Sequence, residues 1–164
     1  MINKRINKRN VLHAIIILCL IINLAFIFGQ SAKTPEKSTE TSDKVGEIVG
    51  EVIPPETKPG AFIQINLRKI AHFVEFATLG FLSSLYVVFL GIEKRKVALS
   101  LLFSPLIALL DETLQIFSGR GSSVKDVWID TLGFFAASLI FYTVYALTKI
   151  IIKKVNNYRQ NQTE

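Results

Sequence analysis

The chain has 164 residues, of which 50% are hydrophobic and 20% are charged, and its formal net charge is +6. The apolar residues come in long blocks, which is typical of membrane spans and excludes an ordinary water-soluble domain. The basic residues lie in short clusters beside these blocks and no nucleic-acid-binding motif accompanies them, so we expect a lipid bilayer as partner and no nucleic acid. The single cysteine, Cys19, excludes a disulfide within one chain.

Residues 1–29 combine a basic start with an almost unbroken Ile/Leu-rich run from Val11 to Phe28. Such a segment is either a cleaved signal peptide or a retained membrane anchor. The apolar run is longer than the roughly 7–15 residues that are usual for a signal peptide. In addition, Gln30-Ser31-Ala32 lacks a small residue at the first position of an A-x-A-like cleavage site. We therefore favour a retained first transmembrane helix.

Residues 30–66 form a polar loop after the first span. Residues 31–44 mix Lys, Glu, Ser and Thr without an apolar period, which predicts a solvated linker. Aliphatic residues then recur at helical spacing and predict a short amphipathic helix at the membrane surface: Val45, Ile48, Val49, Val52 and Ile53. Pro54-Pro55 should end that helix, and Pro59-Gly60 indicates a turn. We expect residues 61–66 to be extended or to lie at the interface.

Residues 67–152 contain three further spans. They run from Leu67 to Gly91, from Val97 to Phe117 and from Asp126 to Ile152. The basic turn Glu93–Lys96 and the Gly/Ser connection Ser118–Ser123 join them, and residues 153–164 form a polar tail. The sequence therefore predicts an all-α membrane protein with four transmembrane helices.

Three basic clusters set the expected orientation: the N-terminal segment, the Glu93–Lys96 turn and the C-terminal tail. Cytoplasmic segments of membrane proteins carry an excess of Lys and Arg. Four spans place all three clusters on one side, so both termini are predicted to be cytoplasmic. The 30–66 loop and the 118–125 loop then lie outside.

Polar residues gather at the predicted outer ends of the last three spans, and they are spaced so that each helix carries one polar stripe. A charge in the middle of the bilayer costs about 2.5–3.5 kcal/mol or more, so we expect the stripes to face one another and not the lipid. This polar cluster consists of Arg68, Lys69, His72, Glu75, Asp111, Glu112, Gln115, Arg120, Asp126 and Asp130.

Small residues four positions apart predict close helix packing in the same spans. The pairs are Gly80 with Ser84, Ser104 with Ala108, and Gly133 with Ala137. Pro105 lies in the third span, where we expect it to kink the helix.

The candidate catalytic residues are His72, Glu75 and Asp130, because a histidine beside carboxylates can carry out general acid–base chemistry near neutral pH. His72-x-x-Glu75 is a weak metal signature without a second histidine nearby, so no metal is predicted. No zinc motif, phosphate loop or nucleophile motif is present, and no cofactor is expected.

Two interpretations of the cluster as a whole remain open. Arg68, Lys69 and Arg120 suit an anionic headgroup, since guanidinium groups bind phosphate and carboxylate in a bidentate way. The alternative is a purely structural network, in which Arg68 and Lys69 only anchor a helix at the interface and Arg120 pairs with Asp111 or Asp126. The number of polar groups at one end of the spans favours a functional site.

Two stretches resemble the motifs of the VanZ-like family of bacterial membrane proteins. The first is RKIAHFVEFATLG at residues 68–80, and the second is DETLQIFSGRGSSVKDVWIDTLG at residues 111–133. Phe76 stands where a tyrosine is common in the family, and Leu114 stands where a histidine often precedes the glutamine. The family's namesake is associated with reduced susceptibility to the glycopeptide teicoplanin. The resemblance implies a multi-pass protein of the bacterial cytoplasmic membrane with a role in the cell envelope.

Our first hypothesis is a non-enzymatic envelope protein whose outer face binds an anionic lipid-linked or cell-wall group and alters glycopeptide susceptibility. The expected partners are the membrane lipids, a cell-wall precursor lipid or the glycopeptide itself. The alternative is a membrane enzyme that acts on a lipid headgroup, with His72 and either Glu75 or Asp130 as acid–base groups.

Overall fold

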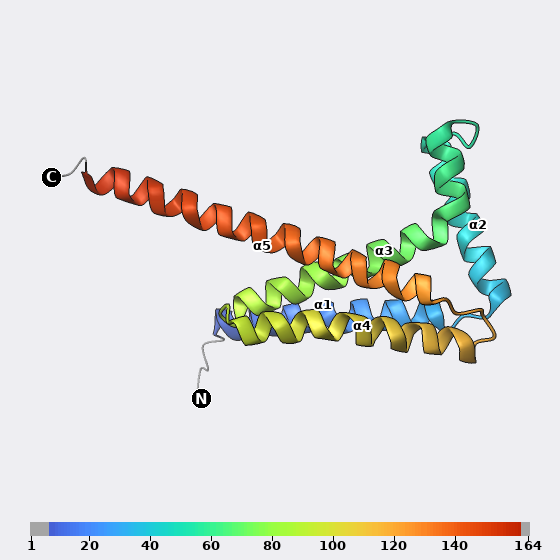
Figure 1. Cartoon of the computed structure of the whole chain (residues 1–164), viewed down its shortest axis with the longest axis horizontal. Helices are drawn as coiled ribbons and strands as arrows, with labels where there is room; N and C mark the ends of the chain where they lie inside the picture. The colour runs from blue at the N-terminus through green and yellow to red at the C-terminus, as the bar shows by residue number, and fades with distance from the viewer. Residues whose placement is uncertain (1–6, 162–164) are drawn as a thin grey trace, which may run out of the picture.

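The computed structural model describes residues 7–161 (Figure 1). In this part of the chain all regular secondary structure is α-helical, as predicted. The helices are α1 (Lys8–Ser31), α2 (Pro35–Val52), α3 (Lys58–Phe89), α4 (Lys94–Phe117) and α5 (Val124–Asn161). All of these except α2 are long and apolar enough to cross a membrane, which confirms the four predicted spans. Lys4 and Arg5 of the basic N-terminal cluster, and residues 162–164 of the tail, lie outside the described residues.

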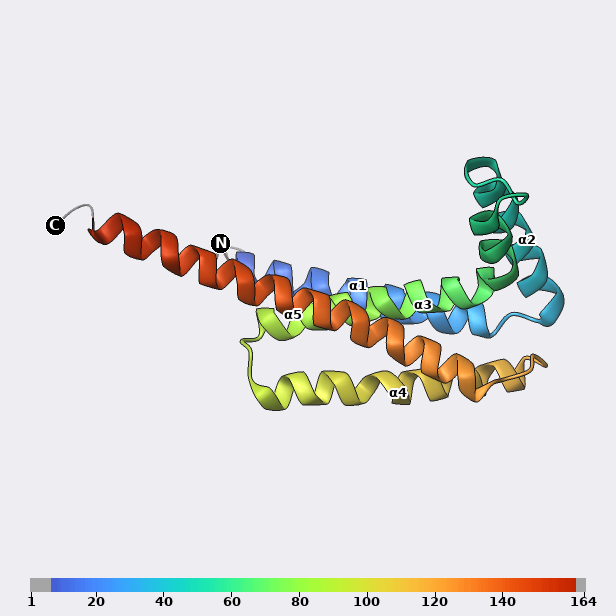
Figure 2. The same ribbon diagram turned by 45° about the horizontal axis from the view of Figure 1, so that its top comes forward.

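The four spans run along one another as a bundle, and α2 lies across one end of it (Figures 1 and 2). The start of α1, the connection from α3 to α4 and the C-terminal end of α5 all lie at the opposite end (Figure 1). The described basic residues of the three clusters therefore share one end of the bundle, as the orientation argument requires.

The bundle has a small core to which all four spans contribute. Its buried residues are Ile27, Phe76, Leu79, Ala108 and Phe134. Gly80 of α3 and Gly133 of α5 allow these two helices to touch, because an added Cβ at either position would overlap the backbone of the other helix. This confirms the close packing predicted for these two glycines. Helix α4 continues through Pro105 without interruption.

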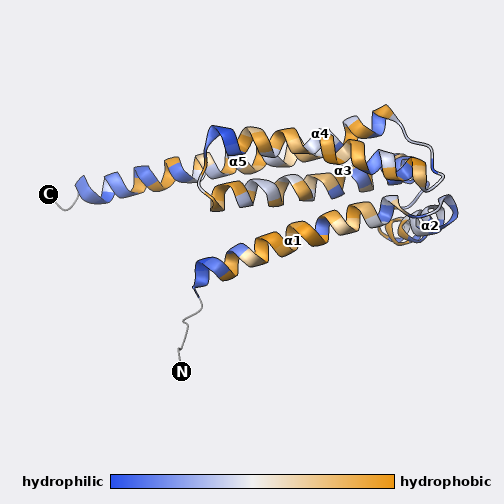
Figure 3. Cartoon of the chain, turned by 90° about the horizontal axis from the view of Figure 1, so that it is seen from below, coloured by the Kyte–Doolittle hydropathy of each residue, from blue (hydrophilic) through white to orange (hydrophobic). Residues whose placement is uncertain are grey.

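The outward faces of the bundle are apolar and exposed. Large hydrophobic side chains such as Leu102, Phe103, Leu139 and Ile140 face away from the core. Figure 3 shows hydrophobic colours along the spans and hydrophilic colours towards the ends of the structure. A surface of this kind is stable in lipid and unstable in water, so the folded chain is a multi-pass membrane protein.

The prediction of a solvated linker over residues 31–44 was wrong, because α2 already begins at Pro35. Proline fits the first helical position, where its missing N–H needs no partner. Further along, Lys44 Nζ donates to Glu40 Oε1 at 2.7 Å, one turn earlier, which supports the helix locally. The helix ends at Val52, just before Pro54-Pro55, as expected.

Residues 61–66 belong to α3, so they are not extended, and the interfacial alternative stays a prediction. The Pro59-Gly60 pair starts this helix instead of making a turn. Thr57 caps it, because its side-chain oxygen accepts a hydrogen bond from Gly60 N at 3.1 Å. Helix α5 likewise continues beyond the predicted end at Ile152 and includes much of the polar tail.

Candidate functional site

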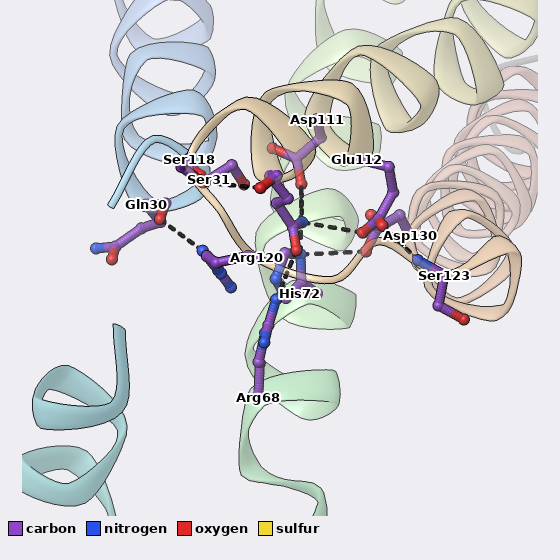
Figure 4. A network of polar contacts seen from close by, with 11 residues as sticks. Gln30, Ser31, Arg68, His72, Asp111, Glu112, Ser118, Arg120, Ser123 and Asp130 are labelled. Atoms are coloured by element: carbon purple, nitrogen blue, oxygen red, sulfur yellow. Dashed lines mark hydrogen bonds and ion pairs between the residues drawn. The ribbon is translucent and has the colours of Figure 1, made fainter. Parts of the chain in front are cut away.

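The polar ends of α3, α4 and α5 meet at the end of the bundle that α2 covers (Figure 4). His72 lies at the centre of this group. Its Nδ1 atom is 3.5 Å from Asp130 Oδ1 and 3.7 Å from Asp111 Oδ2. Both aspartates are fully buried, and His72 is only 8% exposed. Three helices therefore place one imidazole between two carboxylates, away from the lipid.

Gln115, one turn after Asp111 on α4, connects the histidine group to the neighbouring charges. Its amide nitrogen donates to Asp111 Oδ2 at 3.1 Å and to Glu112 Oε1 at 2.9 Å. Its amide oxygen accepts a hydrogen bond from Arg68 Nη2 of α3. The buried amide thus uses both its donor and its acceptor, which fixes its orientation.

The loop between α4 and α5 is tied to this network by Glu112. Glu112 Oε2 accepts a hydrogen bond from the backbone N–H of Ser123 at 2.8 Å, just before α5 begins at Val124. Gln115 O also accepts a hydrogen bond from the backbone N–H of Arg120 at 2.9 Å. The loop that carries Arg120 is therefore held in one conformation over the polar cluster.

Arg120 links the loop to the end of α1. Its Nη1 donates to Gln30 O at 3.0 Å, while nearby Ser118 Oγ donates to Ser31 O at 2.9 Å. Burial, together with the neighbouring Arg68, lowers the pKa of the Arg120 guanidinium from its usual value. Two cations therefore lie close together at one end of the protein, and the charge of Arg68 makes that of Arg120 less favourable.

A pocket of about 220 Å³ opens beside these two arginines. Arg68, His72, Glu75 and Arg120 form its charged and titratable wall. Helix α2 contributes three hydroxyl side chains, and the end of α1 and one face of α3 contribute apolar ones. The remaining lining residues are Phe26, Gln30, Ser38, Thr41, Ser42, Val45, Leu67 and Ala71.

Lys69 and Asp126 lie apart from this pocket, although the sequence grouped them with it. They line a separate pocket of about 260 Å³ on another side of His72, together with Ile65 and Ile129. Arg68 and His72 border both pockets. Of the predicted cluster, Glu75 and Arg120 thus line only the first of these two pockets, and Lys69 and Asp126 line only the second. The remaining members line neither of the two: Asp111, Glu112, Gln115 and Asp130.

Sequence reasoning missed the contributions of α1 and α2. Gln30 and Ser31 lie at the predicted outer end of the first span, just as the other polar residues lie at the outer ends of theirs. Their position could therefore have indicated that α1 contributes to the site. On α2, Ser38, Thr41, Ser42 and Val45 recur at the spacing of one helical face, but the prediction of a linker hid this pattern.

The arrangement supports two kinds of chemistry. The two guanidinium groups and the hydroxyls of α2 can bind an oxyanion. The imidazole between Asp111 and Asp130 can exchange protons or bind a cation, and the three residues can bring one ligand atom each to within 4.8 Å of one another.

Fold and site together define a multi-pass α-helical membrane protein with a buried polar centre at one end. The chain belongs to the VanZ-like family, because the family model described as VanZ/LLP1 matches residues 14–148. This range includes both quoted motifs and confirms the resemblance. No curated protein and no solved structure gives a significant match to the chain.

Proposed function

We propose that this protein binds the anionic headgroup of a lipid-linked or cell-wall precursor at the outer face of the bacterial cytoplasmic membrane. The observation that carries the proposal is the pair Arg68 and Arg120 at the wall of one pocket. Bound phosphate or carboxylate would relieve the repulsion between the two cations, since it accepts hydrogen bonds from both.

The partners of the two arginines support this assignment. Among the described residues Arg68 donates to an amide oxygen and Arg120 to a backbone carbonyl oxygen, and neither forms an ion pair with a carboxylate. The Nε atom of Arg120 is buried and lacks a hydrogen-bond partner within the described residues. Both positive charges are therefore available for an anionic ligand.

The surroundings of the pocket favour a lipid-linked ligand. The pocket combines the charged wall with Phe26, Val45 and Leu67, so one ligand could place its headgroup on the arginines and its first carbons on apolar side chains. Withdrawal of a precursor headgroup into this pocket would change what a glycopeptide meets at the membrane surface. This is the basis on which we propose an effect on teicoplanin susceptibility.

Binding can be tested with the full chain in lipid nanodiscs and with a matched pair of probes. We expect a polyprenyl phosphate to bind and the corresponding polyprenol, which lacks the phosphate, to bind at least about tenfold more weakly. Arg120→Gln and Arg68→Gln should each remove about tenfold in affinity for the phosphate, whereas Lys125→Gln, an exposed control, should bind normally. Equal binding of phosphate and alcohol would overturn the proposal.

A second candidate function is an enzyme that acts on a lipid headgroup. The observation in its favour is His72 at the border of the pocket with Glu75 beside it and Asp130 behind it. A histidine so placed can transfer a proton to or from a bound headgroup. Turnover of a labelled lipid precursor that is lost in His72→Gln would support this function, and its absence across a range of pH and metal ions would exclude it.

A further inference from the structure

We propose that His72, Asp111 and Asp130 bind a divalent metal ion of the first transition row. The sequence predicted no metal here, because ligand spacing along one helix gave only a weak signature. The three residues come from α3, α4 and α5, so their proximity exists only in the folded chain. The site does not depend on the proposed anion binding and goes beyond it.

The buried charges of this centre call for a cation. Asp111 and Asp130 are both fully buried, and within the described part of the chain the only ion-pair partner of either is His72. Buried carboxylates are normally paired or bound to metal. One imidazole carries at most a single positive charge, whereas the two aspartates carry two negative charges when both are ionised. A divalent ion would balance them.

The unpaired polar atoms of this centre also indicate a bound metal ion. Both carboxylate oxygens of Asp130, and Nδ1 of His72, lack a hydrogen-bond partner among residues 7–161. These atoms are the electron-pair donors that a metal ion uses. Their side chains lie at the centre of the network and point toward one another (Figure 4). They are therefore oriented as ligands around a common point.

The distances agree with a small shared ion. Nδ1 of His72 is 3.5 Å from Asp130 Oδ1 and 3.7 Å from Asp111 Oδ2. Two ligand atoms that each lie about 2.1 Å from a tetrahedral ion are about 3.4 Å apart. Gln115 Nε2 donates to Asp111 Oδ2 at 3.1 Å, and contacts of this kind orient metal-binding carboxylates.

The donor set selects the class of metal. One imidazole nitrogen with two carboxylate groups suits Zn²⁺, Mn²⁺, Fe²⁺ or Co²⁺ better than Mg²⁺ or Ca²⁺, which prefer oxygen alone. Three protein ligands leave a fourth position free, as in sites where the metal also meets a ligand or water. His72 borders both pockets, so the proposed metal centre lies next to them.

Metal binding can be measured on the full chain in detergent, after removal of any affinity tag and treatment with a chelator. Calorimetric titration with Zn²⁺ and Mn²⁺ should give one saturable site per chain, and Mg²⁺ should bind at least about tenfold more weakly. Co²⁺ should give visible absorption bands whose intensity reports a tetrahedral site. Asp130→Asn and His72→Gln should each weaken Zn²⁺ binding at least about tenfold.

Asp43→Asn is the matched control, because it makes the same change on the exposed surface of α2 and should bind Zn²⁺ normally. Gel filtration and circular dichroism show whether each variant is folded. If one variant does not fold, the proposal is still tested by the Co²⁺ spectrum of the unaltered chain and by Zn²⁺ binding to the other variant.

The proposal is overturned if the unaltered chain has no saturable site for these ions, or if His72→Gln and Asp130→Asn bind them as tightly as it does. Arg120→Gln separates the two proposals, since it should lose phosphate binding and keep Zn²⁺ binding. A negative metal titration alone therefore does not contradict the proposed anion site. Likewise, a lack of phosphate binding alone does not contradict the proposed metal site.

Discussion

Gly80 of α3 lies directly against the backbone carbonyl group of Phe134 in α5, with no room for a side chain between them. Gly133 makes the reciprocal approach to the backbone of Phe73. These contacts hold α3 and α5 at the separation that brings His72 and Asp130 together. The position of the polar centre thus depends on two glycines outside it.

Replacement of Gly80 by alanine should therefore destabilise the protein. The added Cβ would overlap the backbone of α5, so the helices must move apart, and overpacking of this kind costs about 1–3 kcal/mol. Thermal unfolding in detergent should show a lower midpoint. Gly29→Ala is the control, because nothing lies within 4 Å of the added Cβ there. An unchanged midpoint for Gly80→Ala would contradict the observed helix contact.

Replacement of Glu112 by alanine should loosen the loop that carries Arg120. The change leaves the partly buried Ser123 N–H without its acceptor, so the cost should not exceed the about 1–3 kcal/mol of a fully buried unsatisfied group. Hydrogen exchange should become faster over residues 118–123. Glu112→Gln keeps an oxygen acceptor and should largely restore protection. Equal exchange in all three proteins would show that Glu112 does not hold the loop.

The glycopeptide phenotype should distinguish the two pockets. Arg120→Ala removes a guanidinium from the first pocket, whereas Asp126→Ala changes only the second. In cells that express the protein, Arg120→Ala should abolish any shift in the inhibitory concentration of teicoplanin at equal membrane abundance. A loss with Asp126→Ala as well would extend the binding site to the second pocket. Full activity of both variants would contradict a role for the polar cluster.

The orientation of the bundle can be read from thiol labelling of intact cells. Cys19 is first replaced by serine, and single cysteines are then placed at Ser122 and Ile92, which are exposed at opposite ends of the bundle. The positive-inside rule predicts that an impermeant reagent labels position 122 and not position 92. Permeabilised cells should allow labelling of both. Labelling of only position 92 in intact cells would reverse the predicted orientation.

We expect α1 to be retained in the mature protein. It packs Ile27 into the core, and His13 Nε2 lies 2.8 Å from the hydroxyl oxygen of Tyr86 on α3. Cleavage would also remove the Gln30 carbonyl that binds Arg120 if it fell after that residue. Intact mass spectrometry of the protein purified from membranes should give the full 18.4 kDa of the chain. A smaller mass that lacks α1 would show cleavage.

Several features of this protein followed from local patterns in the sequence. The four spans could be predicted because a membrane helix needs about 20 consecutive apolar residues. The polar stripes could be predicted because spacing such as that of Asp126 and Asp130 is a property of one helix. Helix starts were harder to predict, since Pro35 and Pro59 suggest a turn as readily as the first turn of a helix.

Contacts between helices were decided by the tertiary structure alone. The sequence grouped Lys69 and Asp126 with the other polar residues, whereas the structure places them in a second pocket. Likewise, spacing along α3 linked His72 to Glu75, but the closest carboxylates to its Nδ1 atom come from α4 and α5.

The physical reason is that hydropathy and periodicity fix which residues share a face of one helix. They do not fix how that helix is rotated against its neighbours, which depends on close backbone approach at Gly80 and Gly133. The sequence by itself determined the number of spans and the chemistry of their polar ends. Only the packing of α3 against α5 and α4 decided that His72, Asp111 and Asp130 meet at one buried point.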